Sequence, residues 1–242
     1  MSRILTRMKQ SNLTLPAITI QSCKGPIRVE LGDGASRHFG DARNFTAEIL
    51  RQINEERRYE RFFKDRSGLV LLDIGANIGL VTLYAQPACR RIVAIEPTPA
   101  HCEILWQLGA PYNNIEIVQA ALSATNGPVE FFLCPHNSTM NSLLKTGEAS
   151  CLVEGVTLDA LCERLRLDRV DLCKVDIEGS EYQALTVEQF GKNRQRIRAY
   201  YIETHPGPEF GQIAGRERLE TLLAQCGYRI ETLGPETTYA CL

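Results

Sequence analysis

The stretch from Leu69 to Gly79 constrains the fold of this chain more than any other. It opens with an unbroken apolar run and then reaches the sequence Asp73-Ile74-Gly75. An apolar run without alternation is typical of a parallel strand that is buried on both faces. The glycine turn is followed by the apolar segment 80–85, which suits a helix. Strand, glycine turn and helix together predict the nucleotide-binding unit of a doubly wound α/β sheet.

The spacing inside this turn indicates which nucleotide it binds. It reads D-x-G-x-x-x-G, whereas dinucleotide folds carry G-x-G-x-x-G. An acid just before the first glycine would repel a pyrophosphate, but it suits a ligand that carries an ammonium group. S-adenosylmethionine has such a group, with a sulfonium, a ribose and an adenine. We therefore expect this cofactor to be held by Asp73, Gly75, Ala76, Asn77 and Gly79. The Asn77 side chain would bind the methionine carboxylate or cap the helix.

Composition narrows the class of protein. The chain has 242 residues, of which 44% are hydrophobic, so we expect one main domain with a real core. A net charge of −2 gives no electrostatic reason to expect nucleic acid as a partner. Nine cysteines without a C-x-x-C pair favour reduced thiols and a cytoplasmic protein. The most apolar window, 69–85, contains Asp73, Asn77 and two glycines, so we expect no integral membrane segment. A homo-oligomer is left open.

The rest of the chain alternates predicted strands and helices. Residues 17–31 carry a hairpin pattern with Lys24-Gly25-Pro26 between its strands, a Gly32-Asp33-Gly34 turn follows, and 45–63 suit one or two helices. Alternation of this kind predicts an α/β fold, a mostly parallel sheet with helices on both faces and an antiparallel last strand. We expect residues 1–44 to be an extension with a hairpin and 45–242 to be the main domain. Further strands are predicted at 91–96, 115–119, 129–133, 170–177, 197–203, 228–232 and 238–241, with helices at 97–108, 157–166 and 216–226.

The end of the second strand carries the next candidate cofactor residues. Glu96 follows Gly75 by about 20 positions, where an acid accepts hydrogen bonds from ribose hydroxyls. A surface glutamate at a strand end is the alternative interpretation of Glu96. Pro97 follows it directly. Ala120, after the third strand, falls where the adenine should lie, with Gln119 or Ser123 as the polar contact.

Charged residues cluster at the ends of the fourth and fifth strands. Lys174, Asp176 and Glu178 should share one side of their strand. An alternative is that Lys174 only forms structural ion pairs there. Asp176 is expected to face the transferring methyl group, and His205 or Asp176 to act as general base, beside Glu203. A less favoured alternative is a divalent metal held by Asp176, Glu203 and His205. We expect Glu178 and the polar loop residues Ser138 and Asn141 to contact the acceptor, although this loop suits an ordinary turn as well.

Five motifs together resemble the FkbM-type methyltransferases. They are Asp-Ile-Gly-Ala-Asn-Ile-Gly (73–79), Ala-Ile-Glu-Pro (94–97), Thr-Leu-Asp (157–159), Lys-Val-Asp-Ile-Glu-Gly-Ser-Glu (174–181) and Ile-Glu-Thr-His (202–205). The resemblance covers residues from about 45 to 205. It implies a Rossmann-like class I methyltransferase fold, a seven-stranded sheet with the last strand antiparallel, and S-adenosylmethionine as cofactor. Members of this family methylate hydroxyls of sugars and of polyketide-like natural products.

The function expected from these observations is O-methylation of a sugar hydroxyl on a small molecule, glycan or glycolipid, for instance a deoxyhexose of a lipo-oligosaccharide. O- or N-methylation of a polyketide or peptide natural product is the alternative within methylation. From other classes, an NAD-dependent oxidoreductase and a non-catalytic cofactor-binding domain remain as rivals. The spacing of the glycine turn argues against the first, and the charged cluster at 174–181 argues against the second.

Overall fold

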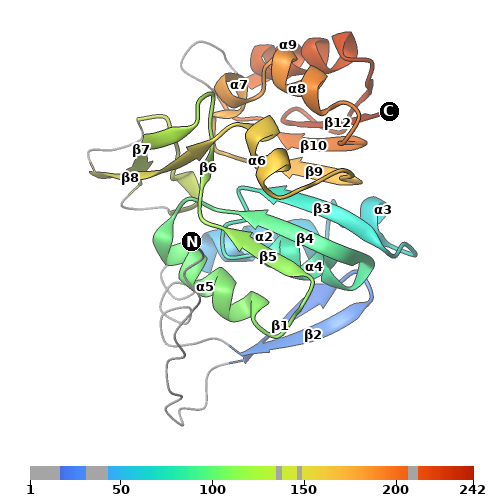
Figure 1. Ribbon diagram of the computed structural model, residues 1–242. Coiled ribbons are helices and arrows are strands. Elements are labelled where there is room, and N and C mark those ends of the chain that lie inside the picture. The colour runs from blue at the N-terminus through green and yellow to red at the C-terminus, as the bar shows by residue number, and fades with distance from the viewer. Residues whose placement is uncertain (1–16, 31–42, 135–137, 146–148, 207–211) are drawn as a thin grey trace.

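The computed structural model in Figure 1 describes residues 17–30, 43–134, 138–145, 149–206 and 212–242. A central twisted sheet carries helices on both of its faces, with a hairpin and a second small sheet beside it. The strands are β1 Ala17–Ser22, β2 Gly25–Glu30, β3 Leu69–Ile74, β4 Cys89–Ile95, β5 Ile115–Val118, β6 Ala121–Leu122, β7 Gly127–Leu133, β8 Ala149–Val156, β9 Leu172–Val175, β10 Ala199–Glu203, β11 Arg229–Thr232 and β12 Thr237–Cys241. The helices are α2 Arg43–Asn54, α3 Glu60–Phe63, α4 Leu80–Ala85, α5 Pro99–Gly109, α6 Leu158–Arg164, α7 Glu181–Ala184, α8 Val187–Asn193 and α9 Gln212–Gln225, with short 3₁₀ turns η1 Gln86–Ala88 and η2 Ser138–Met140.

The order of the central sheet confirms the predicted α/β fold. Its strands run β11-β12-β10-β9-β3-β4-β5. Strands β5, β4, β3, β9 and β10 are parallel, and β12 is antiparallel to both of its neighbours. The chain therefore forms a seven-stranded, mostly parallel sheet whose last strand is antiparallel. That strand lies inside the sheet between β10 and β11, and not at its edge.

Burial of β3 on both faces explains why its sequence does not alternate. Val70, Leu72 and Ile74 pack into a core with α6, α8 and α9. Leu71 points to the opposite face, into a core with α2, α3, α4 and α5. Successive side chains of a strand point to opposite faces, so apolar residues occupy both faces of β3, with Asp73 as the polar exception. Each of these four side chains is at most 2% exposed.

Several elements were predicted correctly and others were missed. The hairpin is confirmed as β1 and β2, which pair antiparallel, and it is tied to α4 through the Cys23 N–H, which donates to the Tyr84 carbonyl over 3.0 Å. Thr157 is the predicted N-cap, since its side chain accepts from the Ala160 N–H. The sequence analysis missed β6, β8, α7 and α8. The predicted turn at 32–34 lies outside the described residues.

The small sheet β6-β8-β7 lies beside the carboxyl ends of the parallel strands. Strand β7 is the predicted extra strand, and it pairs with β8 along its whole length. Carboxyl ends of parallel strands are where open α/β sheets bind ligands. Within the described ranges, no helix is long and apolar enough to cross a membrane.

Candidate active site

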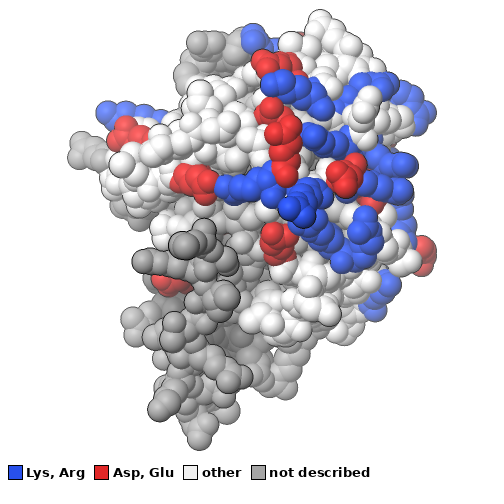
Figure 2. Space-filling view, viewed as in Figure 1, with Lys and Arg blue, Asp and Glu red and all other residues white. Residues whose placement is uncertain are grey.

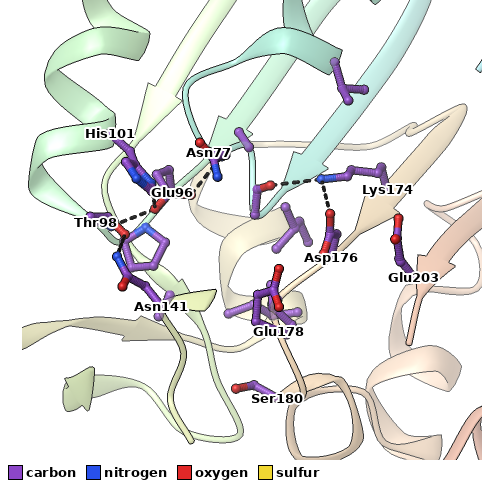
Figure 3. Close-up of a pocket in the computed structure, with 18 of the residues that line it drawn as sticks. Asn77, Glu96, Thr98, His101, Asn141, Lys174, Asp176, Glu178, Ser180 and Glu203 are labelled. Atoms are coloured by element: carbon purple, nitrogen blue, oxygen red, sulfur yellow. Dashed lines mark hydrogen bonds and ion pairs between the residues drawn. The ribbon is translucent and has the colours of Figure 1, made fainter. Parts of the chain in front are cut away.

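A single pocket gathers most of the residues that the sequence singles out. Its cavity volume is about 210 Å³, and it lies where β3, β4, β9 and β10 end. Figure 3 shows Asn77 and Glu96 on one side of the pocket and Asp176, Glu178 and Glu203 on the other. Its walls include Gly75, Ala76, Asn77, Glu96, Pro97, Ala120, Ser138, Asn141, Lys174, Asp176, Glu178, Glu203 and His205. The topology therefore unites segments that are more than a hundred residues apart in the sequence.

The glycine turn is held between two strands. The N–H groups of Gly75 and Ala76 both donate to the Ile95 carbonyl of β4 over 3.0 Å. Gly75 has φ +73°, and a Cβ at this position would lie 1.8 Å from the carbonyl oxygen of Asp176. A side chain is therefore excluded here by backbone conformation and by contact with the segment that follows β9.

Asn77 and Asp73 have structural partners inside this turn. The side-chain oxygen of Asn77 accepts from the Ile78 N–H over 2.7 Å. The N-cap of α4 is Gly79, so the prediction that Asn77 caps this helix is wrong. Asp73 is fully buried and accepts from the Thr82 hydroxyl over 2.6 Å. Neither Asp73 nor Gly79 lines the pocket, and direct contact of these two residues with the cofactor remains only a prediction.

Glu96 is a buried carboxylate, 5% exposed, that links the two cofactor segments. One of its oxygens accepts from the Asn77 N–H and the other from the Thr98 N–H, each over 2.9 Å. His101 Nδ1 lies 3.2 Å from the second oxygen. Burial alone would raise the pKa of Glu96, but the contacts with His101 and Thr98 outweigh it and the pKa is lowered. The sequence indicated no functional context for His101, yet it lines the pocket beside Glu96.

The geometry of Glu96 fits a ribose-binding role. An ionised carboxylate offers about four acceptor positions, and the Asn77 and Thr98 N–H groups use one on each oxygen. The contact with His101 Nδ1 uses a further position on Oε1, so acceptor capacity remains on Oε2 for a ribose hydroxyl. The small side chains of Ala120 and Ala121 line the same pocket, as the adenine prediction for Ala120 requires. Neither Gln119 nor Ser123, the suggested polar contacts, is among its lining residues.

Lys174 connects the glycine turn to the acidic side of the pocket. Its side chain is 4% exposed, and Nζ donates to the Gly75 carbonyl over 2.9 Å. The same atom lies 3.4 Å from Asp176 Oδ2 and 3.5 Å from Asp73 Oδ1, the latter an ion pair without hydrogen-bond geometry. Burial disfavours the ammonium, but Asp176 and Asp73 outweigh it and raise the pKa of Lys174. Lys174 therefore forms the structural ion pairs that the alternative interpretation predicted, and it also lines the pocket.

His205 lies among carboxylates at the end of β10. Its Nδ1 is 3.1 Å from Glu181 Oε1, and its Nε2 is 3.6 Å from Glu178 Oε2 and 3.9 Å from Asp176 Oδ1. Burial opposes its charge, but the Glu181 hydrogen bond and the charges of Asp176 and Glu178 raise the pKa of His205 to about 10. The imidazole is therefore protonated near neutral pH when no ligand is bound.

Two carboxyl groups near His205 also have raised pKa values, which favours their neutral form. Burial and the Asp176 charge raise the pKa of Glu178 to about 8, although His205 opposes the change. Burial and the same charge raise the pKa of Glu203 to about 7, against His205 and Arg58. Arg58 Nη1 lies 3.6 Å from Glu203 Oε1. Perturbed groups that converge on one pocket are typical of a catalytic site.

The predicted acceptor loop closes one side of the pocket. Asn141 receives a hydrogen bond from the Cys134 N–H over 2.8 Å, and its Nδ2 donates to the Thr98 hydroxyl over 3.3 Å. Ser142 Oγ donates to the Glu178 carbonyl over 2.8 Å. The loop is thus tied both to the cofactor side and to the acidic side. Ser138, Asn141 and Glu178 all line the pocket, so contact with an acceptor is sterically open to each of them.

Comparison with known proteins agrees with this geometry. Residues 73–230 match the Methyltransferase FkbM domain. The chain belongs to this family. It is therefore an S-adenosylmethionine-dependent methyltransferase, and the family favours this function over the NAD-dependent oxidoreductase. Membership covers all five motifs from which the resemblance was inferred, since each lies inside the matched range.

Two relatives and one solved structure show the range of similarity. The chain is 27% identical over 231 residues to AMB antimetabolite synthetase AmbE of Pseudomonas aeruginosa, and the match covers 74% of this chain but only 11% of AmbE. It is 26% identical over 226 residues to methyltransferase sdnD of Sordaria araneosa, with 75% of this chain and 85% of sdnD covered. A fibrillarin pre-rRNA processing protein of Methanococcus jannaschii has 12% identity and a TM-score of 0.46, with 73% and 67% coverage.

Proposed function

We propose that this FkbM-family protein methylates a hydroxyl group of a sugar, free or on a glycan or glycolipid. The observation that carries this proposal is the two-sided pocket, in which Glu96 lies opposite a second group of carboxyl groups, Asp176, Glu178 and Glu203. His205 lines the same pocket. Carboxyl groups accept hydrogen bonds from hydroxyls in both protonation states and also donate when protonated, and a sugar offers several hydroxyls at once. The acidic side therefore suits an acceptor rich in hydroxyl groups.

The residues on the first side of the pocket hold the cofactor in this proposal. S-adenosylmethionine supplies a methyl group on a positively charged sulfur. Glu96 would accept from the ribose, the Gly75-Ala76-Asn77 backbone would contact the amino-acid end, and Ala120 would leave space for the adenine. These residues would bind and orient the cofactor. The positive charge of the sulfonium is lost in the transition state of methyl transfer, so alignment of the reacting groups is the main contribution required of the protein.

The residues on the second side orient the acceptor and receive its proton. An alcohol is a weak acid, so a base must take the proton as the new carbon–oxygen bond forms. Asp176 and His205 are the candidate bases, and Glu203 lies beside them in the same pocket. His205 would act as a base only after it gives up the proton that it holds when no ligand is bound. The N–H of Asp176 donates to the Ile74 carbonyl over 3.1 Å, which fixes the backbone of this residue next to the glycine turn.

A second candidate acceptor is a polyketide or peptide natural product, methylated on oxygen or nitrogen. Similarity to a protein named as an antimetabolite synthetase favours it, although this chain spans only 11% of that protein. The two candidates differ in the acceptor group and not in the cofactor side. A test of acceptors therefore separates them.

Charge distribution favours a small acceptor over nucleic acid. Figure 2 shows basic side chains interspersed with acidic ones on the face viewed. Arg91 pairs with Glu116, Arg169 with Asp171 and Arg196 with Glu163. Arg91 and Arg169 lie near the amino ends of β4 and β9, the sheet edge opposite the pocket. We also propose a cytoplasmic location, because all nine cysteines are free.

Methyl transfer to a panel of acceptors tests this proposal. Deuterated S-adenosylmethionine and mass spectrometry would locate the new methyl group on free sugars, glycolipids and peptide products. We expect transfer to a sugar hydroxyl, with turnover lowered at least about 100-fold in Asp176→Asn or His205→Gln. The exposed control Glu188→Gln, on α8, should keep its turnover. Transfer only to peptide nitrogen would replace the proposal by its alternative, and unchanged turnover in both variants would remove the catalytic assignment.

A further inference from the structure

Three side chains at the acidic side of the pocket converge closely enough to share one ligand. Asp176, Glu178 and His205 each offer an atom that lies within 4.8 Å of the other two. Asp176 and Glu178 follow β9, and His205 follows β10, so two adjacent strands fix the group. All three are partly exposed toward the pocket. A small ligand in this pocket can therefore reach all of them.

The orientation of His205 is set from behind by a buried carboxylate. Glu181 is fully buried, and its Oε1 accepts from the Ile177 N–H and contacts His205 Nδ1 over 3.1 Å. Its other oxygen, Oε2, is buried without a hydrogen-bond partner among the described residues. The backbone of His205 is held as well, because its carbonyl accepts from the Tyr182 hydroxyl over 2.6 Å. Histidines that bind metals are held in this way, with the second ring nitrogen on a carboxylate.

The positive side chains nearby, Lys174 and Arg58, do not contact every carboxylate oxygen of this group. Lys174 contacts Asp176 through Oδ2, while Oδ1 faces His205. Glu203 has Arg58 as its own partner at 3.6 Å. Asp176 Oδ1 and Glu178 Oε2 thus converge on the single Nε2 atom of His205, with the buried Glu181 directly behind the ring. An added positive ion in front of Nε2 would be favoured by this arrangement.

We propose that Asp176, Glu178 and His205 form a binding site for a divalent cation, Mg²⁺ or Mn²⁺. Carboxylates select these ions, and the imidazole favours Mn²⁺ of the two. Three protein ligands leave the remaining positions of an octahedral ion to water and to the acceptor. Resting on the proposed function, this site would bind the acceptor hydroxyl and lower its pKa. Metal ligands bind in their deprotonated form, so the cation takes the place of the Nε2 proton.

The structure assigns a different ligand set from the one that the sequence suggested. Sequence analysis grouped Glu203 with Asp176 and His205. Glu178 takes that place among the described residues, because its carboxylate is within reach of both others whereas Glu203 is not part of the converging set. This difference gives the test a matched pair of variants, Glu178→Gln and Glu203→Gln.

Titration of the purified 242-residue chain with MnCl₂ tests the site without cofactor or acceptor. Calorimetry and the loss of the free Mn²⁺ signal in electron paramagnetic resonance should both show one site. We expect Glu178→Gln and Asp176→Asn to weaken binding at least about tenfold, and Glu203→Gln and the exposed control Glu188→Gln to change it less than about threefold. Thermal unfolding without metal would verify that each variant is folded.

Absence of Mn²⁺ binding by the wild-type protein would overturn the proposal, and so would equal binding by wild type and Glu178→Gln. Equal losses in Glu178→Gln and Glu203→Gln would overturn the assigned ligand set. Because the titration involves neither methyl donor nor acceptor, its failure is distinct from a failure of the proposed function. That function is tested separately by methyl transfer from S-adenosylmethionine.

Discussion

At the scale of single residues, Gly75 leaves less room for a side chain than any other glycine among the described residues. Its positive φ and the Asp176 carbonyl both oppose a side chain. Gly68 offers a matched control, because its φ of +70° is similar but nothing lies within 4 Å of the added Cβ. We predict that Gly68→Ala lowers the free energy of unfolding by about 1–2 kcal/mol, the backbone strain alone.

Gly75→Ala should lower the free energy of unfolding by more than about 4 kcal/mol, because a clash adds to that strain. Urea unfolding of the two variants measures the difference. Equal losses would show that the contact between the glycine turn and Asp176 is not as close as described.

Lys174 is the second residue on which the site depends. Lys174→Met removes the cation between Asp73 and Asp176, and leaves fully buried Asp73 with an uncompensated charge. We expect a loss of about 3–5 kcal/mol in unfolding free energy. Combining it with Asp73→Asn should restore part of this loss, since the buried charge is then gone. A double variant as unstable as the sum of the two single variants would argue that Lys174 acts through packing instead.

Residue identity allowed much of the site to be predicted, and the exceptions have physical reasons. Residues with ionisable side chains at strand ends were recognised from the sequence, namely Glu96, Asp176, Glu203 and His205. His101 and Glu181 were missed, since only the folded chain brings His101 to Glu96 and Glu181 to His205. Asp73 stands in the expected motif but is buried beneath the turn, which spacing alone does not reveal.

At the scale of elements, α6 shows a pH effect that the structure predicts. Asp159 lies in its first turn; burial would raise its pKa, but hydrogen bonds led by the one from Thr157 lower the pKa to about 2. Its folded pKa is below its unfolded value, so its stabilisation is complete above the unfolded pKa and is lost as the pH falls through about 2.

The stability difference between wild type and Asp159→Asn should therefore narrow as the pH falls from about 6 to about 2.5. Urea unfolding at several pH values measures it. Asp168→Asn, which removes an exposed carboxylate before β9, is the control and should show a small difference throughout. A difference for Asp159→Asn that widens on acidification would contradict the assigned hydrogen bonds.

Helices and strands were predictable where the sequence carries a clear apolar run or a clear helix start signal. Apolar runs mark residues 69–72 of β3, 92–95 of β4 and 199–202 of β10. Helix α5 begins at Pro99 with Thr98 as its N-cap residue, two positions after the predicted start at Pro97. Strand β8 was missed because it contains a glycine and several polar residues, and Leu152 on it is 76% exposed. Helices α7 and α8 have four and seven residues, too short for a helical period to stand out.

At the scale of the whole molecule, the sheet order explains why distant motifs form one site. Strand β3 lies between β4 and β9, and β9 pairs with β10, so the ends of all four strands meet at one edge. The alternation of strands and helices predicted this arrangement because parallel connections are right-handed and short. The division into an extension at 1–44 and a main domain at 45–242 remains a prediction.

We propose that this pocket binds S-adenosylmethionine through Glu96. Calorimetric titration of the purified protein with S-adenosylhomocysteine, and separately with NAD, tests it most directly. We predict micromolar binding of S-adenosylhomocysteine, weakened at least about tenfold in Glu96→Gln and unchanged in Glu103→Gln, an exposed control on α5. NAD should not bind. Binding of NAD instead, or equal binding of S-adenosylhomocysteine by wild type and Glu96→Gln, would contradict the account.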